Sequence, residues 1–82
     1  MTQELTLTPV RVGTDTEDED GRLVFARDLL VAVLVRLAEK HENAGDWFLE
    51  HGFGRLDVPV SPTFSNLQAA EIWIVGRLSS GR

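Results

Sequence analysis

The stretch Leu29-Leu30-Val31-Ala32-Val33-Leu34-Val35 decides the fold class of this chain. Between Leu29 and Leu37 only Arg36 is polar, so the segment lacks the polar stripe that a surface helix needs. Its alternating valines would lose rotamer freedom in a helix, whereas they pack well on a pleated sheet. The pattern therefore predicts a central strand over residues 29–37. The alternative interpretation is one buried central helix over residues 24–41.

Composition limits the class of protein. The chain has 82 residues, is 43% hydrophobic and contains no cysteine, so a small apolar core must hold it together without disulfides. The net charge of −5 and the lack of a basic cluster argue against direct nucleic-acid binding. No segment has the roughly 18–20 apolar residues of a membrane span, and the N-terminus lacks a signal-peptide pattern. We expect a soluble cytoplasmic protein, and the seven arginines against one lysine indicate a GC-rich bacterial or phage genome.

Turn-forming and alternating residues on both sides of the central stretch predict further strands. An edge strand is expected over residues 3–12, with a bulge at Pro9, followed by an acidic loop over residues 13–21. A second strand, residues 22–26, reaches the central strand through the short connection Arg27-Asp28. Beyond a polar hairpin loop over residues 38–46, a fourth strand is expected over residues 47–54. Its two glycines, Gly52 and Gly54, are expected to permit a bulge or a close approach of a helix.

The C-terminal segment predicts a helix after an extended connector over residues 55–63. Ser65 and Gln68 form a capping-box pattern, and Phe64 is placed to pack on Ala69. The apolar stripe of the helix, which is expected over residues 65–78, consists of Leu67, Ala70, Ile74 and Leu78. Residues 1–82 are thus predicted to form one α+β domain, a small antiparallel meander of three to four strands with one C-terminal helix packed on one face.

The predicted pairing of the two strands around the 38–46 loop assigns the faces of the sheet. If Leu37 pairs with Trp47, the next pairs are Val35 with Leu49, Val33 with His51 and Val31 with Phe53. This valine face is expected to lie under the helix. A shift of one residue would exchange the two faces, so the assignment depends on the register.

The opposite face is the candidate interface. It is expected to carry apolar side chains that a helix of about 13 residues, roughly 20 Å long, leaves uncovered. Large exposed apolar patches usually mark contact surfaces, so we expect a non-enzymatic interaction or regulatory module that binds a second copy of itself or another protein. The candidate interface residues are Leu23, Phe25, Leu30, Ala32, Leu34 and Phe48.

The acidic tract supports an alternative function. An inhibitor or decoy of phage or plasmid type would present this charge to the basic groove of a nucleic-acid-binding enzyme. A calcium loop is not indicated, because Thr16 and Arg27 stand where the pattern requires acidic ligands. The candidate contact residues of the tract are Asp15, Glu17, Asp18, Glu19 and Asp20.

A second alternative is a small-molecule or metal site near His41, Asp46 and His51. Zinc needs three or four converging ligands at defined spacing, and the sequence does not bring these three together. His51 is expected on a sheet face beside Val33, as a partly buried structural residue. No pattern indicates catalytic residues or a cofactor, so none is predicted.

Overall fold

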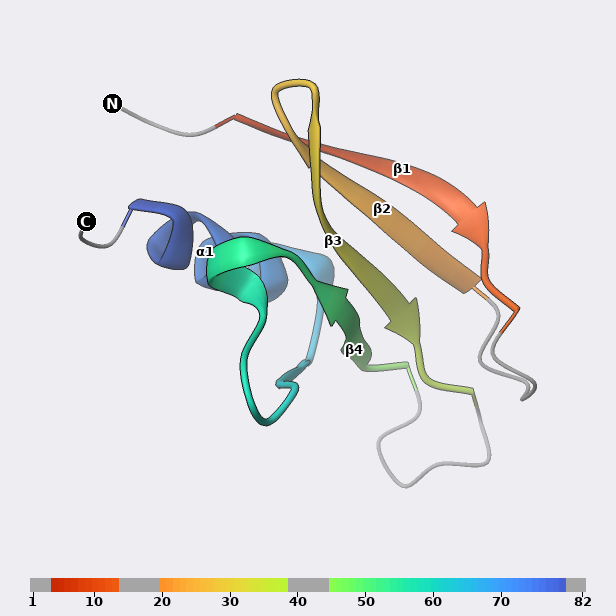
Figure 1. Ribbon diagram of the computed structural model, residues 1–82. Coiled ribbons are helices and arrows are strands. Elements are labelled where there is room, and N and C mark those ends of the chain that lie inside the picture. The colour runs from red at the N-terminus through yellow and green to blue at the C-terminus, as the bar shows by residue number, and fades with distance from the viewer. Residues whose placement is uncertain (1–3, 14–19, 39–44, 80–82) are drawn as a thin grey trace.

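The protein is a five-stranded antiparallel sheet followed by one helix (Figure 1), as seen in a computed structural model that describes residues 4–13, 20–38 and 45–79. The strands follow one another in the sheet in chain order, as in a meander. The α+β fold class predicted from the sequence is confirmed. The elements are β1 (Leu5–Arg11), β2 (Asp20–Ala26), β3 (Leu29–Arg36), β4 (Trp47–Gly52), the 3₁₀ turn η1 (Gly54–Leu56), β5 (Thr63–Phe64) and α1 (Leu67–Ser79).

The central strand β3 pairs with β2 on one side and with β4 on the other. The strand interpretation of the apolar stretch is therefore confirmed, and the alternative of a central helix is wrong. Strand β2 begins at Asp20, two residues earlier than expected, so Asp20 and Gly21 belong to the sheet and not to the acidic loop.

A fifth strand was not expected from the sequence. The connector after η1 returns to the free edge of β4, where the two residues of β5 pair with Trp47 and Phe48. The amide N of Leu49 also donates to the carbonyl O of Pro62, at 3.2 Å. Such a short strand has no periodicity of its own, and it exists because β4 offers unpaired backbone groups.

Two register shifts decide which side chains face the helix. Val33 pairs with His51 as predicted, but Leu34 pairs with Leu49, so Glu50 is the extra residue of a bulge in β4. A second shift lies between β2 and β3. Val24 pairs with Ala32 and Phe25 with Leu30, so Val31 is the extra residue in β3. A bulge inserts one unpaired residue and reverses the alternation beyond it. From Leu34 onward the pairing therefore differs by one residue from the predicted register.

The core lies on the face that was predicted to be free. Ala32 and Leu34 have no exposed surface and pack with Val24, Leu49 and the helix residue Ile74, among others. The assignment of the valine face to the helix was wrong, because the bulge at Glu50 brings Leu34 opposite Leu49. On α1, the predicted stripe is confirmed, since Ala70 and Ile74 are buried and Leu67 and Leu78 pack against the core.

The cap of the helix lies one residue later than predicted. The side-chain Oδ1 of Asn66, and not the hydroxyl of Ser65, accepts a 2.7 Å hydrogen bond from the amide N of Ala69. Phe64 is buried, and the centre of its ring lies 5.6 Å from that of Trp73. Phe64 therefore packs on the middle of the helix. Asn66 is consequently the N-cap residue of α1.

Replacing this cap is expected to destabilise the domain moderately. Asn66→Ala should lower the free energy of unfolding by about 1 kcal/mol, because an amide of the first turn loses its acceptor. For a domain of this size the melting temperature should fall by several degrees, measured by circular dichroism. Ser65→Ala is the matched control and should have little effect. A larger effect at Ser65 than at Asn66 would place the helix start at the earlier residue.

Candidate protein-interaction face

The face of the sheet opposite α1 is built from three rows of paired residues. One row runs Thr8, Leu23, Val33 and His51, and the next runs Val10, Gly21, Val35 and Phe48. Thr6, Phe25 and Leu30 form the third row. We call these eleven residues the uncharged face, because their side chains include no Asp, Glu, Lys or Arg in a chain of which 26% is charged. Open antiparallel sheets normally turn polar side chains to solvent, so this composition is unusual.

Four charged side chains of these strands lie on the helix side instead, namely Arg11, Asp20, Arg22 and Arg36. The guanidinium of Arg22 donates to Asp20 at 3.0 Å and lies 5.0 Å from the centre of the Trp47 ring. Arg36 lies 4.0 Å from the second carboxylate oxygen of Asp20. Exposed pairs of this kind contribute less than about 1 kcal/mol each to stability. They do, however, locate Asp20, Arg22 and Arg36 away from the uncharged face.

Packing on the uncharged face is tightest around Gly21. Val35 is 1% exposed at the centre of its row. A Cβ atom on Gly21 would lie 2.5 Å from a methyl carbon of Val12 and 3.0 Å from the carbonyl O of Leu34, so a side chain there would displace Val12. Leu23, Phe25, Val33 and Phe48 are half-buried.

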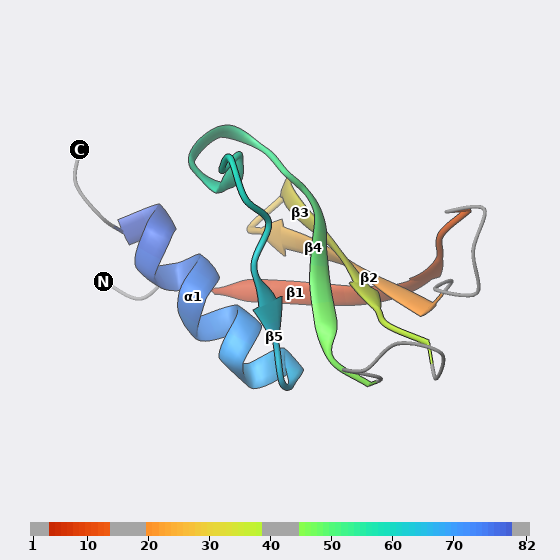
Figure 2. The same cartoon turned by 90° about the horizontal axis from the view of Figure 1, so that it is seen from below.

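The helix leaves this face open. Its contacts are with η1, with β5 and with the core on the other side of the sheet. Figure 2 shows α1 beside β5 at one end of the sheet. Within residues 4–13, 20–38 and 45–79, no helix or further strand covers the uncharged face.

Four of the six candidate interface residues belong to the uncharged face, namely Leu23, Phe25, Leu30 and Phe48. Ala32 and Leu34 do not, because they are buried under α1. Leu30 is 38% exposed and lies near the β2–β3 turn. The sequence prediction missed Val33 as a face residue. It also missed Thr6 and Thr8, although the alternation Leu5-Thr6-Leu7-Thr8 is the signal that could have located them.

Most of the acidic tract lies outside the described residues, including Asp15, Glu17, Asp18 and Glu19. Its last member, Asp20, contacts Arg22 and Arg36 as described above. The decoy hypothesis therefore stays a prediction, and neutralising the tract by Asn and Gln substitutions is its test.

The proposed histidine site is not assembled by the strands. Asp46 precedes β4 and His51 lies near the end of that strand, so about 16 Å of extended chain separates them. His41 lies outside the described residues. His51 is exposed, is paired with Val33 as predicted, and has its ring 4.5 Å from that of Phe53. Among the described residues, no three His, Cys, Asp or Glu side chains are grouped as metal ligands.

Comparison with protein-family models, curated proteins and solved structures finds no match for this chain. In the described part of the chain, α1 and η1 are both too short to cross a bilayer as a helix. The uncharged face is thus the feature from which a function has to be inferred.

Proposed function

We propose that the protein is a non-enzymatic interaction module that forms a homodimer through the uncharged face. The observation that supports this proposal is the absence of Asp, Glu, Lys and Arg from eleven paired residues on three adjacent rows. Charged residues are depleted in the same way at the centres of protein interfaces, where burying an unpaired charge is costly. Half-buried Leu23, Phe25, Val33 and Phe48 supply apolar area for such a contact.

A second copy of the chain is the partner that fits the electrostatics. The chain carries a net charge of −5, so two copies repel each other over most orientations. The uncharged face allows close approach without placing like charges opposite one another. A two-fold dimer would set the same patch of each subunit against its copy, and the patch needs no complementary charge on the partner. A chain of 82 residues also gains apolar burial that its own core cannot supply.

Introducing a charge on this face is expected to break association. Thr8→Asp and Val33→Asp should each convert a species of twice 9.1 kDa into the 9.1 kDa monomer in analytical ultracentrifugation at micromolar concentration. Thr8 is exposed in the single chain, so its variant should fold even if Val33→Asp does not.

The matched control is Ile72→Asp, which places the same charge on an apolar side chain of α1 that is 67% exposed. This variant should keep the mass of the wild-type protein. A wild-type protein that is monomeric at these concentrations would overturn the homodimer, and equal loss of association in all three variants would show that the uncharged face is not the contact.

A cytoplasmic location stays a prediction.

A further inference from the structure

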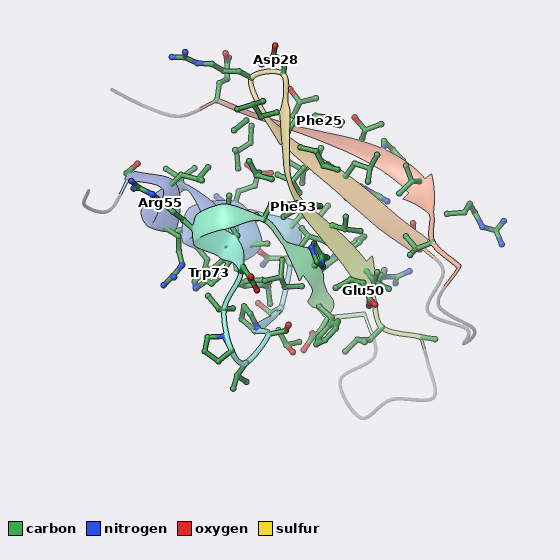
Figure 3. The ribbon with its side chains drawn as sticks, viewed as in Figure 1. Phe25, Asp28, Glu50, Phe53, Arg55 and Trp73 are labelled. Carbon is green, nitrogen blue, oxygen red and sulfur yellow. The ribbon has the colours of Figure 1, made fainter. Side chains whose placement is uncertain are left out.

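A pocket of about 610 Å³ opens at the end of the sheet that carries the β2–β3 turn. Its walls come from that turn, from the segment Phe53-Gly54-Arg55 and from Leu78 in the last turn of α1. Figure 3 shows Phe53 and Arg55 at this end of the molecule, with Asp28 directed away at the tip of the turn. The volume lies in the range of pockets that hold small organic ligands.

The lining of the pocket is apolar and unusually exposed. Leu29, Leu30 and Phe53 are 67%, 38% and 44% exposed, and they are three of the five large hydrophobic side chains that remain exposed among the described residues. Single exposed hydrophobic residues are common, but a concentration of them in one concave site is typical of a ligand-binding surface. The pocket differs from the uncharged face, because Leu78 and Arg55 belong to the helix side.

Two arginines, Arg27 and Arg55, are the charged residues of the lining. Arg55 also holds the helix end: its guanidinium donates to the carbonyl O of Leu78 at 3.3 Å, and its own carbonyl accepts from Arg77 at 3.1 Å. These contacts offset the partial negative charge that the end of a helix would present to an anion. Arg55 therefore has a structural role in addition to its place at the pocket.

Arg27 has no such structural role within the described residues. It is exposed, forms no hydrogen bond or ion pair with another described residue, and occupies the first position of the two-residue β2–β3 turn. Its φ of 61° lies in the left-handed region, where glycine is favoured in hairpin turns of this length. An arginine kept in this conformation beside an apolar pocket points to a use for its charge, since backbone strain of this kind concentrates at ligand sites.

We propose that this pocket binds a monomeric amphiphile with an anionic head group, such as a medium-chain carboxylate. The apolar chain would occupy the space between Leu29, Leu30 and Phe53, and the carboxylate would lie at the rim beside Arg27. Charge complementarity selects this occupant: two cations border an apolar pocket in a chain that is otherwise acidic. Arginine presents a planar fork of donors that matches a carboxylate. The proposal does not depend on self-association, because the pocket shares only Leu30 with the uncharged face.

Titration of ¹⁵N-labelled protein with decanoate, kept below its aggregation concentration, tests the proposal. Saturable amide shifts are expected around residues 29–31 and 53–55. Decanol, which has the same chain without the charge, should bind about tenfold more weakly, as expected for loss of one charge-assisted contact. Absence of saturable shifts at these residues, or equal affinity for decanol and decanoate, would overturn the proposal.

Variants of the pocket separate the two parts of the ligand. Arg27→Gln should remove the preference for decanoate over decanol, Arg27→Lys should retain most of it, and Leu29→Asp should weaken both ligands. Ile72→Asp is the control and should change neither affinity. Vesicles of phosphatidylglycerol form a further arm: binding to them without binding of monomeric decanoate would assign the surface to membranes and contradict a small-ligand site. Loss of dimer formation alone, with decanoate binding retained, would refute only the proposed homodimer.

Discussion

Leu34→Ala is expected to lower the free energy of unfolding by about 2–5 kcal/mol, which is the range for deletion of a buried leucine side chain. Leu34 has no exposed surface and is paired with Leu49 across β3 and β4, under α1. Neighbouring strands and the helix limit how far the cavity can collapse, and an 82-residue domain has little stability to spare. Equilibrium urea denaturation followed by tryptophan fluorescence measures the loss.

Val33→Ala is the matched control, because Val33 is the adjacent residue of the same strand on the opposite face. It is half-buried there, so the expected loss is about 1 kcal/mol or less. Both variants should be measured at a concentration where the wild-type protein is monomeric, since Val33 belongs to the proposed contact. A greater loss at Val33 than at Leu34 would place the helix on the valine face after all.

Gly52→Ala is expected to cost about 3 kcal/mol or more, and to leave part of the protein unfolded at room temperature. A Cβ atom on Gly52 would lie 2.0 Å from the carbonyl O of Leu56, which is backbone and cannot rotate away. Relief of the clash requires η1 to move, and that movement would pull the fully buried Leu56 out of the core. Thermal unfolding followed by circular dichroism would show the loss of stability.

The matched control for this substitution is Gly76→Ala in α1. No heavy atom lies within 4 Å of the Cβ position there, and the residue is exposed. Alanine is favoured over glycine in helices, so this variant should gain about 0.5–1 kcal/mol. A Gly52→Ala protein as stable as the wild type would show that η1 does not pack on β4.

The role of Gly52 was partly predictable. Two glycines at the end of an apolar strand predicted a bulge or a close approach of a helix. The segment that approaches Gly52 is the backbone of the 3₁₀ turn η1 at Leu56, while Gly54 has a φ of 58°. The bulge itself lies two residues earlier, at Glu50. Nothing in the residue types around Glu50 distinguishes it as the unpaired position.

The candidate sites were predictable only where they follow local alternation. Leu23, Phe25, Leu30 and Phe48 were assigned to the open face correctly. The reason is that β2 keeps its alternation up to Phe25, Leu30 lies before the unpaired Val31, and Phe48 lies before the bulge of β4. The pocket was not foreseen, since it joins three segments that are remote in sequence: the β2–β3 turn, η1 and the end of α1. No spacing pattern within one segment could have indicated it.

The sequence by itself determined the strand nature of residues 29–36, the helix near the C-terminus and hence the α+β class. Those features follow from side-chain branching, the period of apolar residues and turn formers, all of which act between near neighbours in the chain. The tertiary structure decided which face of β3 lies under α1, because one unpaired residue at Glu50 shifts the register and exchanges the faces. It also decided which of two suitable residues, Ser65 or Asn66, caps the helix. The reason is that Phe64 is fixed by its pairing in β5, and the helix that follows must pack on the core. Register and docking depend on contacts between distant segments, and their energies are gained only when the whole sheet has formed.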